Sequence, residues 1–530
     1  MARSLCLAII LSLATVGLAS LGPVATLNLA NADIAPDGVS RAASLINGVH
    51  PAPVIMVKKG DRLKLNVVNK LTDPLQLRGT SIHWHGILQR GNNFMDGVPG
   101  VTQCPIAPGD SFLYTMTADI EGTYWYHSHF GVQYCDGVRG ALIVQDPKDP
   151  LKVFYDVDDE STIITLSDWY HELAPSITGI SMQDTTLING KGRFPGGPNA
   201  DLSVVNVQPG KRYRLRLISI SCDPNFTFSI DGHDLTVIET DSVATLPHTV
   251  NRLQILAGQR YSAVLHTNQR VDNYWIRALP NSGNRNISTT FANGVNSAIL
   301  RYKGAPNREP KSNQQKNVNA LSETDLHPLH NPFAPGRPTP NGADVTFNLT
   351  FSFDEPTFKF SINNESFTPP TVPVLLQILS GARNAHDLLP HGGVLTVERN
   401  KVVQINMPSG LIGGPHPFHL HGHTFSVVKS ADAPFNFLNP IQRDVVNVGE
   451  TEGDYVAIRF RTDNPGPWIL HCHIDFHLDI GLAIVFAEAP EQTPSANKNT
   501  PDAWDQLCPA WDSLPISITG THPGVNSTSP

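Results

Sequence analysis

The chain has 530 residues, of which 16% are charged, and its formal net charge is -9 at pH 7. This length is too great for one compact core and predicts two to four domains. The mildly acidic balance lacks the dense positive charge with which proteins bind nucleic acids or anionic membranes, so we expect neither kind of partner.

The N-terminus has the pattern of an export signal, and we assign residues 1–20 to a signal peptide. Arg3 supplies a positive start, Leu5 to Leu18 is an apolar run, and Gly17-Leu18-Ala19 offers a small-x-small cleavage site. The run is too short for a bilayer span, which needs about 20 residues. A buried N-terminal helix is the alternative. The pattern favours a secreted, extracellular protein.

Two further features fit passage through a secretory pathway. Four cysteines remain once Cys6 leaves with the signal and Cys472, which lies between two histidines, is set aside as a metal ligand. An even number favours two disulfides in an oxidising compartment, and the sequence alone permits three pairings of Cys104, Cys135, Cys222 and Cys508. Asn-x-Ser/Thr triplets, which are individually weak signals for glycosylation, begin at Asn225, Asn286, Asn348, Asn364 and Asn526.

Short segments that alternate apolar and polar residues recur along the chain. In chain order, the clearest predicted strands are Arg62–Val68, Arg212–Ile218, Ser262–His266, Val345–Phe353, Val402–Met407 and Tyr455–Phe460. The candidates for short helices are Asp168–Leu173 and Val372–Leu379. Repeated strands without βαβ alternation predict an all-β chain built from sandwiches or barrels.

A degenerate sequence pattern occurs three times. It consists of an apolar strand, then a turn that contains Gly and a basic residue or Asp, then another strand. It includes Val57–Asp61, Val207–Lys211 and Val397–Lys401, spaced by roughly 150 to 190 residues. Coincidence among common turn sequences is the alternative. Asp146–Pro150 and the long, Pro-rich Lys303–Pro340 are suitable boundaries. We therefore expect three β-domains, at residues 21–150, 151–320 and 321–530.

Histidines gather in four short clusters, at 83–86, 127–129, 416–421 and 471–477. On a strand, residues two apart point the same way, so each His-x-His presents two imidazoles to one side. A lone pair of this kind is more often a core or surface feature than a metal site. Chance predicts about one His-x-His in a chain of this composition, whereas five are present. The excess predicts a metal centre.

The fourth cluster indicates which metal. A strand that sends His471 and His473 to one face sends Cys472 to the other. One cysteine with two histidines is the equatorial set of a blue copper site, and His416 and His477 can supply those imidazoles. A zinc site would need several cysteines or a helical His-Glu-x-x-His, and the sequence has neither. The cysteine would also form a short covalent route for electrons to metals on the opposite side.

All four clusters, in this order, resemble the copper-binding motifs of multicopper oxidases and are most similar to those of secreted fungal laccases. The resemblance spans essentially the whole mature chain and implies three cupredoxin domains and four copper ions. It assigns the type 1 copper to His416, Cys472 and His477, and the type 2 copper to His83 and His419. It assigns the pair of type 3 coppers to His85, His127, His129, His421, His471 and His473.

Three further expectations follow from the resemblance. It pairs Cys104 with Cys508 and Cys135 with Cys222. It matches Leu482 to the position where some relatives carry an axial methionine, and because leucine cannot coordinate, we predict a raised potential for the type 1 copper. His423 matches no ligand position and is interpreted as structural.

The activity implied is that of a laccase, in which four one-electron oxidations of phenolic or aromatic substrates, lignin phenols among them, are coupled to reduction of O2 to two waters. Asp96 and Asp475 are candidate proton donors near the copper cluster, and Asp223 matches a pocket carboxylate that accepts the proton of the phenol. Each of these residues also has a purely structural alternative. Asp96 could be a turn residue, Asp475 could form hydrogen bonds at the end of a strand, and Asp223 could open an Asp-Pro turn.

Other readings stay open. An Fe(II) oxidase would need acidic residues around the type 1 copper, and a non-catalytic copper-binding protein is disfavoured by the complete ligand set. Ascorbate or bilirubin oxidases usually carry the axial methionine that Leu482 replaces. The resemblance favours a monomer.

Overall fold

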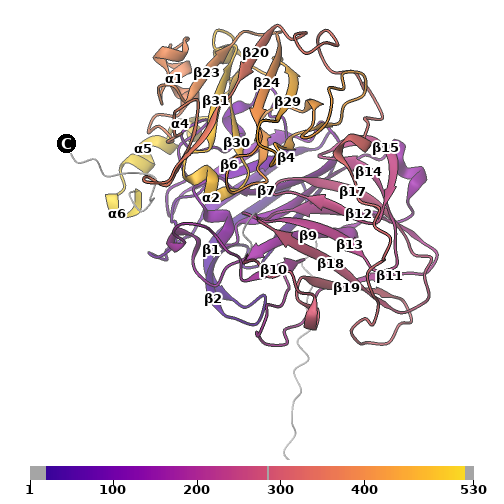
Figure 1. Ribbon diagram of the computed structural model, residues 1–530. Coiled ribbons are helices and arrows are strands. Elements are labelled where there is room, and N and C mark those ends of the chain that lie inside the picture. The colour runs from indigo at the N-terminus through magenta and orange to yellow at the C-terminus, as the bar shows by residue number, and fades with distance from the viewer. Residues whose placement is uncertain (1–19, 283–285, 520–530) are drawn as a thin grey trace, which may run out of the picture.

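The computed structural model describes residues 20–282 and 286–519. The predicted signal peptide, apart from its last residue, and the triplet at Asn526 therefore lie outside the described residues. The described chain consists mainly of β-strands arranged in several sheets, with a few short helices, so the all-β prediction is confirmed. Figure 1 shows three successive groups of strands, coloured indigo, magenta and orange to yellow.

The N-terminal strands form two four-stranded sheets. The first has the order β2-β1-β4-β6, with β1 (Val24–Ile34), β2 (Arg41–Ile46), β4 (Arg62–Asn69) and β6 (Ser111–Thr117). The second has the order β3-β8-β7-β5, with β3 (Ala52–Lys58), β5 (Ile82–His85), β7 (Gly122–Ser128) and β8 (Arg139–Gln145). Along β4, alternate residues are buried, as expected for a strand with one face on a core.

The middle strands form a six-stranded and a five-stranded sheet. The first has the order β10-β9-β12-β17-β14-β15, with β9 (Ile163–Trp169), β10 (Thr185–Ile188), β12 (Arg212–Ser219), β14 (Leu235–Thr240), β15 (Val243–Val250) and β17 (Arg260–His266). The second has the order β11-β19-β18-β13-β16, with β11 (Val204–Val207), β13 (Asn225–Ile230), β16 (Leu253–Ile255), β18 (Asn273–Asn281) and β19 (Ser297–Tyr302).

The C-terminal strands form two five-stranded sheets and a hairpin. One sheet has the order β20-β24-β29-β26-β27, with β20 (Val345–Asn348), β24 (Val402–Pro408), β26 (Phe425–Lys429), β27 (Gln442–Arg443) and β29 (Tyr455–Arg461). The other has the order β23-β31-β30-β25-β28, with β23 (Val394–Val397), β25 (Pro417–Leu420), β28 (Val445–Asn447), β30 (Gly466–Cys472) and β31 (Ala483–Glu488). The hairpin pairs β21 (Phe351–Asp354) with β22 (Lys359–Ile362).

The helices are short, and in the described part of the chain none is long and apolar enough to cross a membrane. They are α1 (Val374–Leu379), α2 (Asp475–Asp479), α3 (Thr493–Ala496), α4 (Asp502–Asp505), α5 (Leu507–Asp512) and α6 (Ile516–Thr519). Disulfides join Cys104 to Cys508 and Cys135 to Cys222, the two pairs that the resemblance implied. The first links α5 to the N-terminal group of strands, across 404 residues of sequence.

Two of the predicted elements are wrong. Asp168 does not begin a helix but lies near the end of β9, where its buried carboxylate accepts hydrogen bonds from Arg139 and from the backbone N–H of Cys222. Val345–Phe353 is not one strand, because β20 and β21 belong to different sheets. The chain turns between them, where the N–H of Thr350 donates to the side chain of Asn363.

Candidate metal centre

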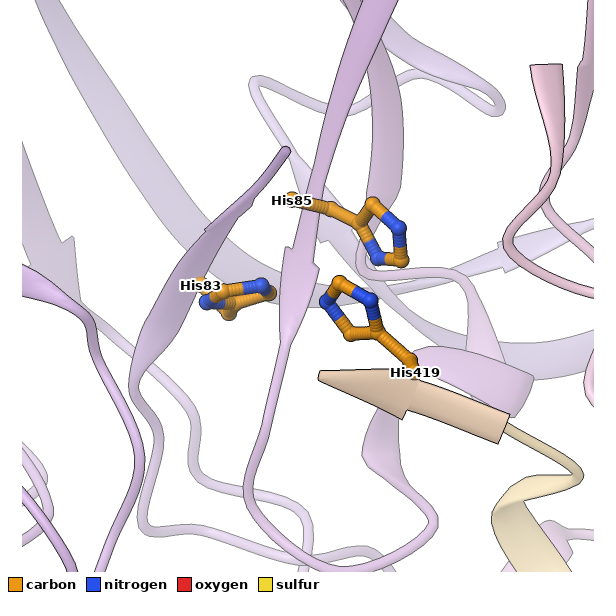
Figure 2. A group of neighbouring side chains, drawn as sticks. All are labelled: His83, His85 and His419. Carbon is orange, nitrogen blue, oxygen red and sulfur yellow. The ribbon is translucent and has the colours of Figure 1, made fainter. Parts of the chain in front are cut away.

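Two pairs of antiparallel strands bring the histidine clusters together. In the N-terminal group, β5 pairs with β7 so that His83 lies opposite His127. In the C-terminal group, β25 pairs with β30 so that His419 lies opposite His471. Because alternate residues of a strand share one face, His85 joins His83 on the same side. Figure 2 shows these two imidazoles facing His419 across the boundary between the two groups of strands.

The imidazoles are buried and form overlapping sets of three. In each set the nitrogen atoms that could bind a metal lie within 4.8 Å of one another. Three of these sets in the described chain consist of histidines alone, namely His83, His85 and His419; His85, His127 and His473; and His129, His421 and His471. The second and third sets share no residue, and the first connects to the second through His85.

Backbone hydrogen bonds fix which ring nitrogen faces the interior of the cluster. The Nδ1–H of His83 donates to the carbonyl of Asp96, and that of His127 to the carbonyl of Ser128, both over 2.8 Å. The Nδ1–H of His419 likewise donates to the carbonyl of Asp444 over 2.8 Å. Each bond leaves Nε2 with its lone pair free, which is the arrangement that metal-binding histidines adopt.

Several of these Nε2 atoms are buried without a hydrogen-bond partner among the described residues, namely those of His83, His127, His129 and His419. A buried polar atom with no partner is costly, and groups of them that converge are rare unless something binds there. Burial, together with neighbouring imidazoles, lowers the pKa of His127, His129 and His421 well below the ordinary value. These three rings are therefore neutral and able to donate lone pairs to metal ions.

A separate set surrounds the cysteine on the opposite face of β30. The Sγ of Cys472 lies 3.6 Å from Nδ1 of His416 and 3.8 Å from Nδ1 of His477, and these two nitrogens are 3.2 Å apart. The Nε2–H of His416 donates to the carbonyl of Ile412 over 3.1 Å, so Nδ1 keeps its lone pair. Two imidazoles and a thiol fit a copper ion of the blue type.

The cysteine connects the two sites. Cys472 faces His416 and His477, whereas the adjacent residues, His471 and His473, face the histidine cluster. The Nδ1–H of His471 also donates to the carbonyl of Cys472 over 2.9 Å. One covalent path through a single tripeptide therefore joins a mononuclear site to a site for several ions.

Models of multicopper oxidase domains match three parts of the chain, residues 28–149, 160–305 and 367–492. The chain belongs to the multicopper oxidase family. These matches, with the sheets described above, confirm the expectation of three cupredoxin-like domains, and membership makes the protein an oxidase.

Known laccases resemble this multicopper oxidase over nearly its whole length. It is 54% identical to Laccase-2 of Pleurotus ostreatus, covering 94% of each chain, and 56% identical to Laccase-2 of Trametes versicolor, covering 95% of this chain and 97% of the relative. Among solved structures, the laccase from Botrytis aclada superposes with a TM-score of 0.80 at 32% identity, covering 93% of each chain. Fet3p, a multicopper oxidase that functions in iron import, also superposes with a TM-score of 0.80, at 28% identity over 93% of this chain and 96% of its own. This similarity supports laccase function.

Leu482 lies directly beside the cysteine site of the oxidase. Its carbonyl accepts a hydrogen bond from the N–H of Cys472, and its N–H donates to the carbonyl of His477, both over 3.0 Å. Its side chain is completely buried, in the same apolar cluster as the cysteine. The backbone of this leucine therefore holds both residues, while its side chain offers a metal no donor atom.

The two candidate proton donors, Asp96 and Asp475, have different surroundings in the structure. Asp96 contacts the histidine cluster, since the Nδ1–H of His421 donates to its Oδ2 over 2.8 Å and Nδ1 of His83 lies 3.4 Å from its Oδ1. Asp475 begins α2, where its N–H donates to the carbonyl of Cys222 over 2.8 Å. Burial raises the pKa of both carboxyl groups above the ordinary value.

Asp223 is buried beside Ser181, whose hydroxyl donates to its Oδ2 over 2.5 Å. Burial raises the pKa of Asp223 to about 7, and the negative charge of Asp168 adds to this effect while the Ser181 hydrogen bond opposes it. The thiol of Cys472 lies close enough that its pKa, raised mainly by burial, is also raised by the charge of Asp223. A carboxyl group with a pKa near neutrality can both accept and release a proton in ordinary buffers.

Sequence reasoning missed a buried ion pair that supports the histidine cluster. Nη1 and Nη2 of Arg260, on β17 of the middle group, each donate to the carboxylate of Asp444 over 2.6 Å. Asp444 in turn lies 3.3 Å from Nε2 of His85, and its carbonyl accepts the bond from His419. All three groups of strands thus contribute to the site. No short motif marks this pair, since its members are 184 residues apart.

His423, two residues after the third cluster, supports the loop between β25 and β26. The Nδ1–H of His423 donates to the carbonyl of His421 over 3.1 Å, and its Nε2 lies 2.9 Å from a carboxylate oxygen of Glu488. Gly422 has a φ of +70° and packs so tightly on Trp468 that a Cβ would approach the indole within 2.4 Å. His423 thus occupies a position that suits its interpretation as structural.

Proposed function

We propose that this oxidase is a laccase with four copper ions, which takes single electrons from phenolic or aromatic reductants and passes them to O2. The observation that carries the proposal is the shared tripeptide His471–His473, because it joins a one-ion site to a cluster that suits three ions. Reduction of O2 to two waters needs four electrons, whereas a phenol supplies one at a time, so charge must be stored between the two sites.

The proposed ligands follow the sets seen in the structure. The type 1 copper is held by His416, Cys472 and His477. Two disjoint sets of three histidines hold the type 3 pair: His85, His127 and His473 for one ion, and His129, His421 and His471 for the other. The remaining imidazoles, His83 and His419, hold the type 2 copper. Their buried, unpartnered Nε2 atoms support this assignment.

Copper ions, when bound, supply one-electron redox chemistry that no amino-acid side chain provides. The protein contributes the positions of the ligands and their surroundings. Cys472 and its two histidine neighbours form the route for electrons, and burial excludes bulk water from that route. Arg260 balances the charge of Asp444 beside the cluster, so that a carboxylate can remain ionised next to neutral imidazoles.

Three carboxyl groups are proposed to handle protons. Asp223 accepts the proton that a phenol loses on oxidation, for which its pKa of about 7 is suitable. Asp96 holds a proton beside His83 and His421, where protons are needed to form water. Asp475 is the second candidate for proton supply, although its contacts are with the segment around Cys222 rather than with the metal-binding imidazoles described above.

The remaining expectations also form part of the proposal. Residues 1–20 direct secretion, the extracellular protein is a monomer, and its domains are residues 21–150, 151–320 and 321–530. The described triplets at Asn225, Asn286, Asn348 and Asn364 are proposed glycosylation sites. Among these, Asn225 is buried at the start of β13, where its side chain donates to the carbonyl of Asn281. Glycan attachment at Asn225 would therefore have to precede the closure of that sheet.

Copper content and oxygen uptake of the purified protein test the proposal together. We expect four copper ions per chain and one O2 consumed for every four molecules of a phenol oxidised. Fewer copper ions without oxygen uptake would indicate a copper-binding protein that is not an enzyme. Turnover of Fe(II) with negligible turnover of phenols and aromatic amines would instead favour an iron oxidase.

A further inference from the structure

The proposed copper sites differ in how many domains supply their ligands. The ligands of the type 1 copper all belong to the third oxidase domain. The type 2 copper instead takes His83 from the first domain and His419 from the third, and the centres of these two rings are 5.8 Å apart (Figure 2). Each set of type 3 histidines also draws on both domains. The trinuclear cluster therefore depends on how the first and third domains are held together.

Asn464 connects two loops that leave the cluster, one from each of these domains. Its side-chain amide donates one hydrogen bond to the carbonyl of Leu88, over 2.8 Å, and another to the carbonyl of Gly422, over 3.0 Å. Leu88 lies three residues after His85, and Gly422 directly follows His421. An amide nitrogen carries two hydrogen atoms, so these two bonds use its full donor capacity. One side chain thus joins the two domains within a few residues of a metal-binding histidine on each side.

The backbone of Asn464 is itself fixed by buried partners. Its N–H donates to Oε1 of Glu488 over 2.5 Å, and its carbonyl accepts a hydrogen bond from Nε1 of Trp468 over 2.7 Å. The other carboxylate oxygen of Glu488 lies 2.9 Å from Nε2 of His423, whose Nδ1–H donates to the carbonyl of His421. Asn464, Glu488 and Trp468 are each at most 1% exposed. The amide cannot leave either loop without breaking a buried hydrogen bond, which is costly.

A second asparagine joins the same two segments of the chain. Asn93, which is buried, donates from Nδ2 to the carbonyl of Pro467 over 2.9 Å. Gly466 packs against it so closely that an added Cβ would lie 2.7 Å from Cγ of Asn93. Arg90 and Asp463 also form an ion pair over 2.9 Å, but both side chains are roughly half-exposed, and such pairs contribute little. The two asparagines therefore provide the buried polar contacts that join the domains here.

We propose that Asn464 is a positioning residue for the trinuclear cluster, which sets the separation between the histidines of the first and third domains. The proposal rests on the laccase function above and extends it to a residue that binds no metal itself. The type 2 copper depends most on this separation, because His83 and His419 come from different domains. The type 1 copper does not depend on it, because its ligands share one domain. A role limited to the stability of the third domain would instead affect both sites alike.

Asn464→Ala removes both hydrogen bonds and adds no charge. Titration of the holoenzyme with EDTA removes the copper ions, while the type 1 copper is followed by its blue absorption and the type 2 copper by its electron paramagnetic resonance signal. We expect the variant to release type 2 copper at an EDTA concentration about 10- to 100-fold lower than the wild type, the range typical for loss of a residue that supports metal ligands. The blue absorption should disappear at the same concentration in both proteins.

Asn69 provides a matched control within the first domain. It is buried, and its side-chain amide donates to the carbonyls of Arg78 and Ile106 over 2.8 and 2.9 Å. Asn69→Ala therefore removes two hydrogen bonds of the same kind, but both acceptors belong to one domain. We expect this variant to hold the type 2 copper as tightly as the wild type. A loss as large as that of Asn464→Ala would show that the link between domains is not the cause, and would overturn the proposal.

Asn93→Ala is a second test, and it decides alone if Asn464→Ala does not develop the blue absorption of a folded type 1 site. It removes one hydrogen bond between the same segments, so type 2 copper should be released at an EDTA concentration about three- to tenfold lower than in the wild type. Unchanged retention of type 2 copper, or an equal loss of type 1 and type 2 copper, would overturn the proposal. A wild-type protein that binds fewer than four copper ions would instead contradict the laccase function.

Discussion

Replacing Asp223 with asparagine should change how the stability of the protein depends on pH. Burial raises the pKa of Asp223 from 3.8 to about 7, whereas in the unfolded chain an aspartate has a pKa of about 3.9. Between about pH 4 and pH 7 the folded protein therefore holds a proton that the unfolded chain has released. Because the unfolded state binds fewer protons, stability falls as the pH rises through this window. A shift of about three units corresponds to a loss of up to about 4 kcal/mol.

Asparagine can still accept the hydrogen bond of Ser181 but cannot ionise. Relative to the wild type, the free energy of unfolding of Asp223→Asn should therefore increase by up to about 4 kcal/mol between about pH 4 and pH 8. Chemical denaturation across this range measures the difference. Asp201→Asn, at an exposed position, is the control and should show a constant difference. A constant difference for Asp223→Asn as well would refute the reasoning that burial keeps this carboxyl protonated.

The same substitution tests the proposed role in catalysis. Ionised Asp223 is the proton acceptor, so the variant should lose up to about 100-fold in kcat/KM for phenols above about pH 7, and its pH profile should lose the inflection near that value. Hexacyanoferrate(II), which releases no proton on oxidation, should be oxidised at nearly the wild-type rate. An equal loss for both reductants would mean that Asp223 does not receive the phenol proton.

Three further substitutions test other parts of the structure. Leu482→Met would add a thioether donor beside the type 1 site and should lower the reduction potential of that site. Redox titration of the blue absorption measures this potential, and an unchanged or higher value would contradict the prediction. Arg260→Met would leave Asp444 buried without its partner and should lower the free energy of unfolding by about 3–5 kcal/mol. The control Arg399→Met, at an exposed position, should change it little. A loss below about 1 kcal/mol for Arg260→Met would count against a supporting role. Cys508→Ser should cost about 2–4 kcal/mol and expose the segment around α5 to limited proteolysis; unaltered cleavage would show that the disulfide does not hold it.

Local patterns in the sequence predicted most strands but failed where tertiary contacts decide the backbone. The alternation through Val345–Phe353 continues across a turn, and only pairing with different partners shows that β20 and β21 are separate strands. Asp168 fits a helical segment by composition, yet it lies in β9 because Arg139 and the backbone of Cys222 provide partners for a buried carboxylate. Such partners are distant in sequence and leave no local signal.

The sequence by itself determined the all-β architecture, the kind of metal and the opposite orientation of Cys472 and its histidine neighbours. These properties depend on the two-residue period of a strand and on ligand chemistry, both of which are local. Only the tertiary structure decided that His85 meets His473 across 388 residues, that Arg260 balances Asp444, and that Asn464 joins two loops beside the cluster. Contacts of this kind arise from the packing of sheets against one another, which no short segment of the chain specifies.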